Sequence, residues 1–263
     1  MFLIKRGQSG PRVIMVQGIL RELGAAIVID GDFGQRTQDA VKAFQRRADV
    51  RLTADGQVGI NTWQAMARLT GYKVINVVDA EDPAQRTRVL GGLTRAGATD
   101  VIVMYGQSNA VAAAVGEVVN RAGGSNTCAM VRFYSHGGEG AQNVAAGHDG
   151  SFMGDYAGFT ADTMPQHAST FARLNDILTP FGCVDLMGCS VGGGANGLRL
   201  LTAMSNAVQH PVEGGMNTQY SQDVGYIPLN FEGPVRQVYP GGVSRHAWGR
   251  RVEGMMPNMT RAG

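Results

Sequence analysis

The first 70 residues carry apolar positions at the period of an amphipathic helix. Three such stretches follow one another, and each is short enough to form a single helix of a small module. The sequence therefore predicts a small three-helix N-terminal domain over residues 1–70. The apolar positions are Val13, Val16, Leu20 and Leu23 in the first stretch, Ala40, Val41, Phe44 and Ala48 in the second, and Trp63, Met66, Ala67 and Leu69 in the third.

From residue 73 the pattern changes to short, continuous apolar runs that alternate with helical stripes. Continuous runs are typical of parallel strands buried on both faces, and alternating strands and helices predict a doubly wound α/β sheet. We expect a mostly parallel sheet with helices on both faces over residues 73–263, with an irregular C-terminal tail from about residue 218. The predicted strands are 73–80, 100–106, 128–136, 183–188 and 211–217, and the predicted helices are 84–96, 109–122, 167–180 and 196–209.

Two segments of the N-terminal part repeat one motif. "DGDFGQRTQDA" begins at Asp30 and "DGQVGINTWQA" begins at Asp55, an offset of 25 residues. In each copy Asp-Gly favours a turn, the second glycine can adopt positive φ, and the threonine stands where a helix begins and can bond its free N–H groups. Each copy therefore predicts a tight loop that leads into a helix.

These segments, with "GQSGPRVIMVQGILRELG" before them, resemble the peptidoglycan-binding domain one family from about Leu3 to Leu69. The resemblance implies binding to wall glycan or stem peptide through the loops of the first repeat. "AAIVIDG" departs from the family, which usually has an aromatic residue before a short Asp-Gly loop. The alternative is that the repeat residues build only the turns. The candidate ligand contacts are Asp30, Asp32, Phe33, Gly34 and Thr37.

Two consecutive predicted core strands end in residues that carry chemistry. One ends in His136 followed by Gly137, and the next ends in Gly188 followed by Cys189. In open α/β sheets the functional crevice lies beyond the carboxyl ends of the strands. A histidine beside a thiol favours the reactive thiolate, and the backbone N–H groups of Gly137 and Cys189 could stabilise an oxyanion. We expect a Cys-His pair at this edge if the two strands are neighbours.

"MVRFYSHG" and "VDLMGCS" resemble the two halves of the signature of caspase-like (clan CD-type) cysteine peptidases. The resemblance implies a caspase-like sheet with Cys189 as nucleophile and His136 as general base and acid. Nothing matches a caspase S1 arginine pattern, which leaves the side-chain specificity open. A retained scaffold without activity is the alternative interpretation, and Ser190 is the second candidate nucleophile.

A competing site follows the predicted strand 100–106, where "GQSNA" precedes a helix. It is close to the G-x-S-x-G motif and resembles the first block of SGNH carbohydrate esterases, which implies Ser108 as nucleophile. The other blocks of that family pattern are missing. The structural interpretation is that Ser108 or Asn109 caps the helix. His148 lies on a glycine-rich loop and could border the cleft.

Composition narrows the function classes. With 23 basic and 21 acidic residues the net charge is +2, which favours no broad nucleic-acid face. Cys128, Cys183 and Cys189 have no zinc-binding spacing, so we expect no metal or cofactor, and Cys128 and Cys183 are predicted to be buried. No apolar stretch approaches the length of a membrane span, and the first residues do not fit a secretory signal.

The sequence therefore favours a bacterial or phage cell-wall-targeted hydrolase that binds peptidoglycan and cleaves a peptide or amide bond. Its substrate would be an envelope protein or the stem peptide. We expect cytoplasmic synthesis and a location in the cell envelope, periplasm or wall, or outside the cell, reached without a recognisable signal peptide. Two alternatives stay open: a non-catalytic peptidoglycan-binding protein whose α/β domain recruits a partner, and the esterase that uses Ser108.

Overall fold

Three helices form the N-terminal part, as the apolar period predicts. The computed structural model describes residues 3–106, 108–145, 157–219 and 230–258. The helices are α1 (Pro11–Glu22), α2 (Gln35–Arg46) and α3 (Ile60–Thr70). Pro11 opens α1, where its missing N–H removes no helical hydrogen bond.

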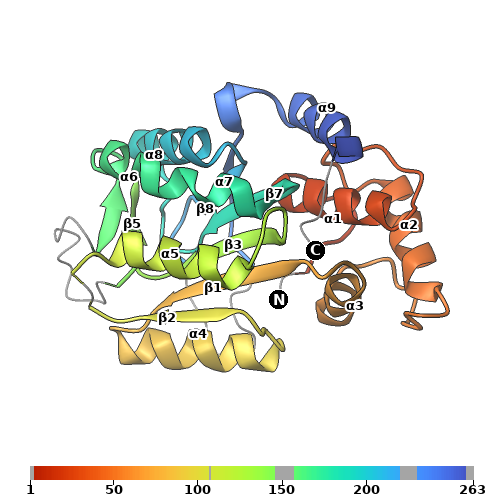
Figure 1. Ribbon diagram of the computed structural model, residues 1–263, viewed down its shortest axis with the longest axis horizontal. Coiled ribbons are helices and arrows are strands. Elements are labelled where there is room, and N and C mark those ends of the chain that lie inside the picture. The colour runs from red at the N-terminus through yellow and green to blue at the C-terminus, as the bar shows by residue number, and fades with distance from the viewer. Residues whose placement is uncertain (1–2, 107, 146–156, 220–229, 259–263) are drawn as a thin grey trace.

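A six-stranded sheet in the order β2-β1-β3-β7-β8-β9 forms the centre of the remaining chain (Figure 1). All its neighbouring strands run parallel except β8 and β9, which are antiparallel. The prediction of a mixed α/β fold with a largely parallel sheet is thus confirmed, whereas the caspase-like assignment stays a prediction. The strands are β1 (Lys73–Asp79), β2 (Val101–Met104), β3 (Cys128–Tyr134), β7 (Leu178–Leu186), β8 (Val212–Gly215) and β9 (Val235–Val238).

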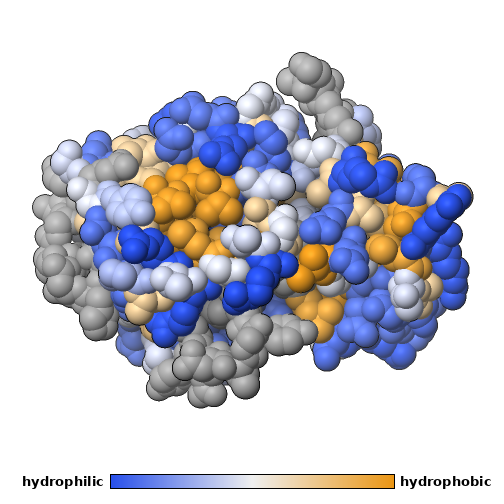
Figure 2. All heavy atoms as spheres, turned by 90° about the horizontal axis from the view of Figure 1, so that it is seen from below, coloured by the Kyte–Doolittle hydropathy of each residue, from blue (hydrophilic) through white to orange (hydrophobic). Residues whose placement is uncertain are grey.

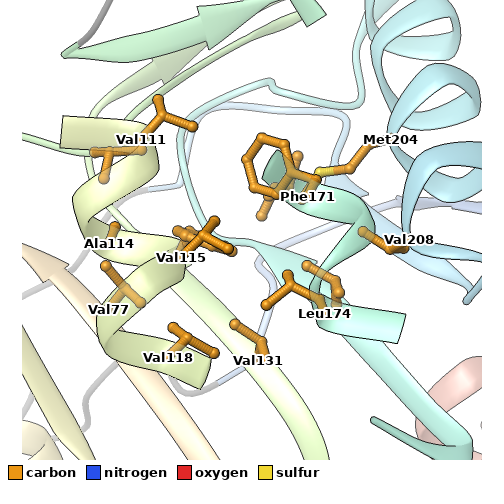
Figure 3. Close-up of a cluster of buried hydrophobic side chains, with 14 of the residues drawn as sticks. Val77, Val111, Ala114, Val115, Val118, Val131, Phe171, Leu174, Met204 and Val208 are labelled. Atoms are coloured by element: carbon orange, nitrogen blue, oxygen red, sulfur yellow. The ribbon is translucent and has the colours of Figure 1, made fainter. Parts of the chain in front are cut away.

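Helices cover one face of this sheet with an apolar core. Val77 and Val131 on β1 and β3 lie in one buried cluster with Val115, Phe171 and Met204 from the helices (Figure 3). The covering helices are α5 (Ala110–Ala122), α6 (Met164–Ala172), α7 (Leu174–Ile177) and α8 (Gly194–Val208). A small antiparallel sheet of β4 (Gly137–Gly138), β5 (Ala141–Asn143) and β6 (Gly158–Thr160) adjoins this layer.

The N-terminal helices themselves cover part of the opposite face. Met130, Phe181 and Cys183 of the sheet belong to the same buried cluster as Ile14 and Val16 of α1. Helix α4 (Pro83–Arg95) covers the rest of this face, over a third cluster. The three-helix part and the sheet therefore share a hydrophobic core. That residues 1–70 fold as a domain of their own stays a prediction.

Buried charges join the same two parts. Arg132, Asp185 and Glu213 stand abreast on β3, β7 and β8. Asp185 Oδ2 accepts from Arg132 Nε at 3.0 Å and from Arg12 Nη2 of α1 at 2.9 Å, and Arg12 Nε lies 3.3 Å from Glu213 Oε2. Burial raises the pKa of Glu213 above its ordinary value by more than Arg12 lowers it. Removing Arg12 would take one of two cations from Asp185 and the cation that lies 3.3 Å from Glu213.

The described residues between 230 and 258 form more regular elements than the sequence predicts. Besides β9, they include α9 (Arg245–Met255), whose N-cap Ser244 accepts a hydrogen bond from the N–H of Ala247. Trp248 and Val252 on α9 are buried in the cluster that α1 shares with the sheet. The prediction of an irregular tail is therefore wrong for these elements. Because α9 has few apolar positions, its sequence shows only a weak helical period of apolar residues. The helix therefore depends on tertiary packing.

The predicted helix over 167–180 is also corrected, because α7 ends at Ile177 and β7 begins at Leu178. Phe181 and Gly182 directly precede the predicted strand that begins at Cys183, and both are buried in the sheet as part of β7. Helical spacing and a fully buried strand give similar apolar patterns over so few residues.

Seen from below, hydrophobic side chains gather in one patch on the sheet-containing half, with hydrophilic residues around it (Figure 2). Val103 and Tyr105, at the end of the edge strand β2, are among the exposed large hydrophobic residues. None of the helices in the described residues has the length and apolarity that a membrane crossing requires.

Candidate functional site

His136 and Cys189 lie beyond the carboxyl ends of two neighbouring strands, β3 and β7. The last paired residues of these strands are Phe133 and Leu186, and His136 and Cys189 each follow three positions later. A Cβ atom added to Gly188 would lie 3.0 Å from the Cα of Gly137, so the two chains run in contact at this point. The sheet thus brings both predicted residues to one edge.

A carboxylate that the sequence analysis missed holds the imidazole. His136 Nε2 lies 2.8 Å from Oδ2 of Asp82, which is the N-cap of α4 and also accepts the N–H groups of Ala84 and Gln85. Burial by itself would raise the pKa of Asp82, but the hydrogen bonds from His136 and from the two backbone N–H groups outweigh it and lower the pKa. Asp82 is therefore an anion that can orient His136.

One signal for Asp82 was present in the sequence. The predicted strand 73–80 is followed by "EDP", and an Asp before Pro is a common start of a helix. What the sequence did not contain is the order of the strands. Because β1 lies directly beside β3, the residues after β1 reach His136.

The Cys189 thiol lies at a tight turn and is partly exposed. Its Sγ atom is 3.6 Å from the carbonyl oxygen of Gln219. The next residue, Ser190, has φ 55°, and its N–H donates to the carbonyl of Asn217 at 2.9 Å. A left-handed conformation at a residue other than glycine is uncommon and occurs preferentially at functional sites. The other two cysteines, Cys128 and Cys183, are buried, as predicted. Burial raises the pKa of the Cys128 thiol to about 12 and that of the Cys183 thiol well above its ordinary value.

The backbone around the pair leaves N–H groups for a ligand. Asn143 N donates to the carbonyl of His136, so Gly137 and Gln142 form the pair that exchanges no hydrogen bonds in the β4-β5 ladder. The N–H of Gly137 is therefore outside that ladder. Within the described residues the N–H of Cys189 also has no acceptor. Both are the predicted oxyanion donors.

Ser108 lies elsewhere on the same edge, after β2, with β1 between β2 and β3. Asn109 is the N-cap of α5, but neither its side chain nor that of Ser108 caps the helix with a hydrogen bond. Among the described residues no hydrogen bond joins Ser108 to a histidine. His148 falls outside the described residues.

The two N-terminal repeats contain the same buried polar network. In the first, Gln17 Nε2 donates to Asp30 Oδ1 at 2.8 Å and to Thr37 Oγ1 at 3.0 Å. In the second, Gln45 Nε2 donates to Asp55 Oδ1 at 2.7 Å and to Thr62 Oγ1 at 3.0 Å. Each glutamine Oε1 also accepts the N–H of the glycine after the aspartate. The repeated Asp and Thr therefore hold the loops in shape.

The remaining predicted contacts of the first loop differ in exposure. Phe33 is 2% exposed and belongs to the core, while Gly34 is exposed as the N-cap of α2. The Asp32 carboxylate accepts two hydrogen bonds from Arg245 Nη2, at 2.7 and 2.8 Å, and lies 3.2 Å from His246 Nε2. Helix α9 thus contacts the loop that the resemblance names as a ligand contact.

A comparison with known protein families finds a match in the N-terminal part of the chain. Residues 9–66 match the family "Putative peptidoglycan binding domain". A solved peptidoglycan-binding protein from Clostridioides difficile, in complex with glutamine hydroxamate, is 40% identical over 26% of this chain and 42% of that protein, with a TM-score of 0.25. No curated protein matches the chain. The family match supports peptidoglycan binding and association with the cell wall.

No group of three or more His, Cys, Asp or Glu side chains among the described residues is arranged to hold a metal ion. The arrangement at the β3-β7 edge instead combines a carboxylate, an imidazole, a thiol and backbone N–H groups. These are the components of acyl transfer by a nucleophile that a base activates.

Proposed function

We propose that this protein is a wall-targeted cysteine hydrolase. The N-terminal helices bind peptidoglycan, and Cys189 attacks the carbonyl carbon of a peptide or amide bond. The substrate is an envelope protein or the stem peptide of the wall, which places the activity in the cell envelope or outside the cell. Docking on the wall raises the local concentration of such a substrate. A caspase-like sheet with Cys189 and His136 is part of this proposal.

The single observation that supports the proposal is the hydrogen bond between Asp82 and His136 at the ends of β1 and β3, beside the end of β7 that Cys189 follows. In this proposal Oδ2 of the Asp82 carboxylate accepts a hydrogen bond from Nε2–H of His136, and Nδ1 takes the proton of the thiol. The thiolate forms a bond to the carbonyl carbon, and the N–H groups of Gly137 and Cys189 stabilise the oxyanion. The imidazolium then returns the proton to the departing amine as the C–N bond breaks, and water hydrolyses the thioester.

The proposal predicts that Cys189→Ala and His136→Ala each abolish release of new amino groups from purified peptidoglycan or from casein. Asp82→Asn keeps a helix-capping side chain but loses the charge. We expect it to lower the rate by at least tenfold and to change the pH profile of kcat. The measurement is the appearance of free amines by fluorescent derivatisation over pH 5–9.

Ser108→Ala is the matched control, since Ser108 stands at the same sheet edge beyond a strand that does not adjoin β3 or β7. It should leave the rate unchanged. Loss of activity in Ser108→Ala with full activity in Cys189→Ala would favour the esterase. No hydrolysis by the unmodified protein, together with retention on insoluble peptidoglycan, would favour the non-catalytic binding protein.

A further inference from the structure

One buried side chain connects the two segments that carry His136 and Cys189. Gln142 is the second residue of β5, the central strand of the small sheet, and it is 0% exposed. Its Oε1 atom accepts a hydrogen bond from the N–H of Gly188, the residue before Cys189, at 3.0 Å. Its Nε2 atom donates to the carbonyl of Asn143 at 3.0 Å. Both ends of the amide group are therefore bonded, and one of them reaches a residue 46 positions away.

The backbone of β5 holds the histidine segment at the same place. Gly137 stands opposite Gln142 in the β4-β5 ladder, and the N–H of Asn143 donates to the carbonyl of His136 at 3.1 Å. Two adjacent residues of β5 thus bond the His136 segment through the main chain and the Cys189 segment through a side chain. The distance between these two segments is therefore set at Gln142.

The packing at this point leaves no room for a larger residue. A Cβ atom added to Gly188 would lie 2.8 Å from Oε1 of Gln142 and 3.0 Å from the Cα of Gly137. Gly188 itself is buried, so its N–H would lack an acceptor without the amide. Because Gln142 occupies that N–H, the next one along the chain, at Cys189, is the group that stays without an acceptor among the described residues.

We propose that Gln142 is a positioning residue, which holds the backbone donors of Gly137 and Cys189, and with them the imidazole and the thiol, at their working separation. The inference rests on the proposed cysteine chemistry. Gln142 is buried, so it acts through Gly188 and not by contact with a substrate. Donors stabilise an oxyanion only if they are held in place before the reaction, and a displacement of about 1 Å can lower a rate about a hundredfold.

The test is Gln142→Met, which keeps the length of the side chain and removes both hydrogen bonds of the amide. We expect kcat for casein to fall about tenfold or more while KM stays nearly unchanged, because the donors act on the transition state. Gln142→Glu should retain more of the rate than Gln142→Met, most clearly at pH 5–6. Burial favours the protonated carboxyl, which still offers an acceptor to Gly188 and a donor to Asn143.

Asn76→Leu is the matched control. Asn76 is another buried amide of the sheet part, and its side chain donates to the carbonyls of Val74 and Asp100, not to the Cys-His edge. It should lower the stability but leave kcat unchanged, with all rates expressed per folded protein as measured by circular dichroism. An unchanged kcat in Gln142→Met, or equal losses of kcat in Gln142→Met and Asn76→Leu, would overturn the proposal.

Alkylation of Cys189 separates this inference from the proposed function. Iodoacetamide labelling of the full chain over pH 5–9, followed by mass spectrometry, measures the pH at which the thiol becomes reactive. A nearby imidazole lowers that pH, so Gln142→Met should raise the midpoint by about half a unit or more, and Asn76→Leu should not. No shift would overturn the proposal. A shift in a chain that hydrolyses nothing would support the role of Gln142 and count against the proposed hydrolysis alone.

Discussion

At the scale of single residues, burial separates groups that the sequence alone makes look alike. Three cysteines occur in the chain, but only Cys189 is exposed to a partial extent, at an edge that also contains His136. Among the histidines, His136 is held by Asp82, whereas His210 is 5% exposed, with Nδ1 3.3 Å from the carbonyl of Gly182. The same residue type therefore serves as a candidate base in one place and as a core residue in another.

Burial of His210 predicts a pH dependence of stability. Its pKa is lowered from 6.5 to about 4 in the folded protein, so the unfolded chain binds the proton more tightly. The stability is fully present above pH 6.5 and is lost as the pH falls from 6.5 to 4, by about 3 kcal/mol in total. His210→Gln keeps a hydrogen-bonding side chain but does not titrate. Between pH 6.5 and pH 4 its free energy of unfolding should therefore fall by about 3 kcal/mol less than that of the unmodified protein.

The measurement is urea unfolding of both proteins at several pH values between 4 and 7.5. Comparing the two proteins cancels the contributions of other groups, such as Asp82 and Glu213. Unfolding free energies that fall in parallel for the two proteins would contradict the assignment of this pH dependence to His210.

At the scale of elements, α9 completes the core of the N-terminal helices although it lies at the other end of the sequence. Arg245 pairs with Asp32. Glu253 accepts hydrogen bonds from Arg21 Nη1 at 2.6 Å and from Ile29 N at 2.9 Å. Trp248 is buried in the core of the N-terminal helices. The contact is so close that a side chain at Gly249 would collide with the carbonyl oxygen of Ile29.

Gly249→Ala should therefore destabilise the protein by about 1–3 kcal/mol, because backbone atoms cannot move aside as a flexible side chain can. Gly254→Ala is the control on the same helix, since nothing lies within 4 Å of a Cβ atom there. It should be neutral or stabilise by up to about 1 kcal/mol through helix propensity. Thermal unfolding of both variants measures the difference, and equal effects would contradict the close packing of α9.

At the scale of the whole molecule, the N-terminal helices are a layer of the α/β fold as well as a candidate binding module. They cover Met130, Phe181 and Cys183 on the sheet, and Arg12 pairs with buried carboxyl groups on β7 and β8. A tether joined by a flexible linker would make no such contacts. Binding of the wall and the proposed chemistry would then occur in a fixed geometry.

A fragment of residues 73–263 should accordingly lack a cooperative unfolding transition and should aggregate, since it exposes an apolar sheet face and buried carboxyl groups without Arg12. Far-UV circular dichroism against urea, with light scattering, measures both properties. Co-expression with residues 1–72 as a separate chain should restore a soluble complex. A monomeric fragment that unfolds cooperatively would show instead that the sheet part is independent.

Much of the fold was predictable because the relevant signals are local. Helical period identified α1, α2 and α3, apolar runs identified most strands, and the repeated Asp-Gly motif identified both loops. Prediction from the sequence failed where tertiary packing, and not the local apolar pattern, decides the structure. Helix α9 has few apolar positions, and the amino-terminal half of β7 has the apolar pattern of a helix. Asp82 was missed because its role depends on which strand lies beside β3.

The sequence by itself determined the element types, the three-helix part and the positions of His136 and Cys189 at strand ends, since turn chemistry and hydrophobic period act between residues close in the chain. Only the tertiary structure decided the strand order that joins Asp82 to His136, the packing of α9 on the first repeat, and the core shared by the N-terminal helices and the sheet. The first two depend on contacts between residues 54 and 213 positions apart, which no local pattern encodes.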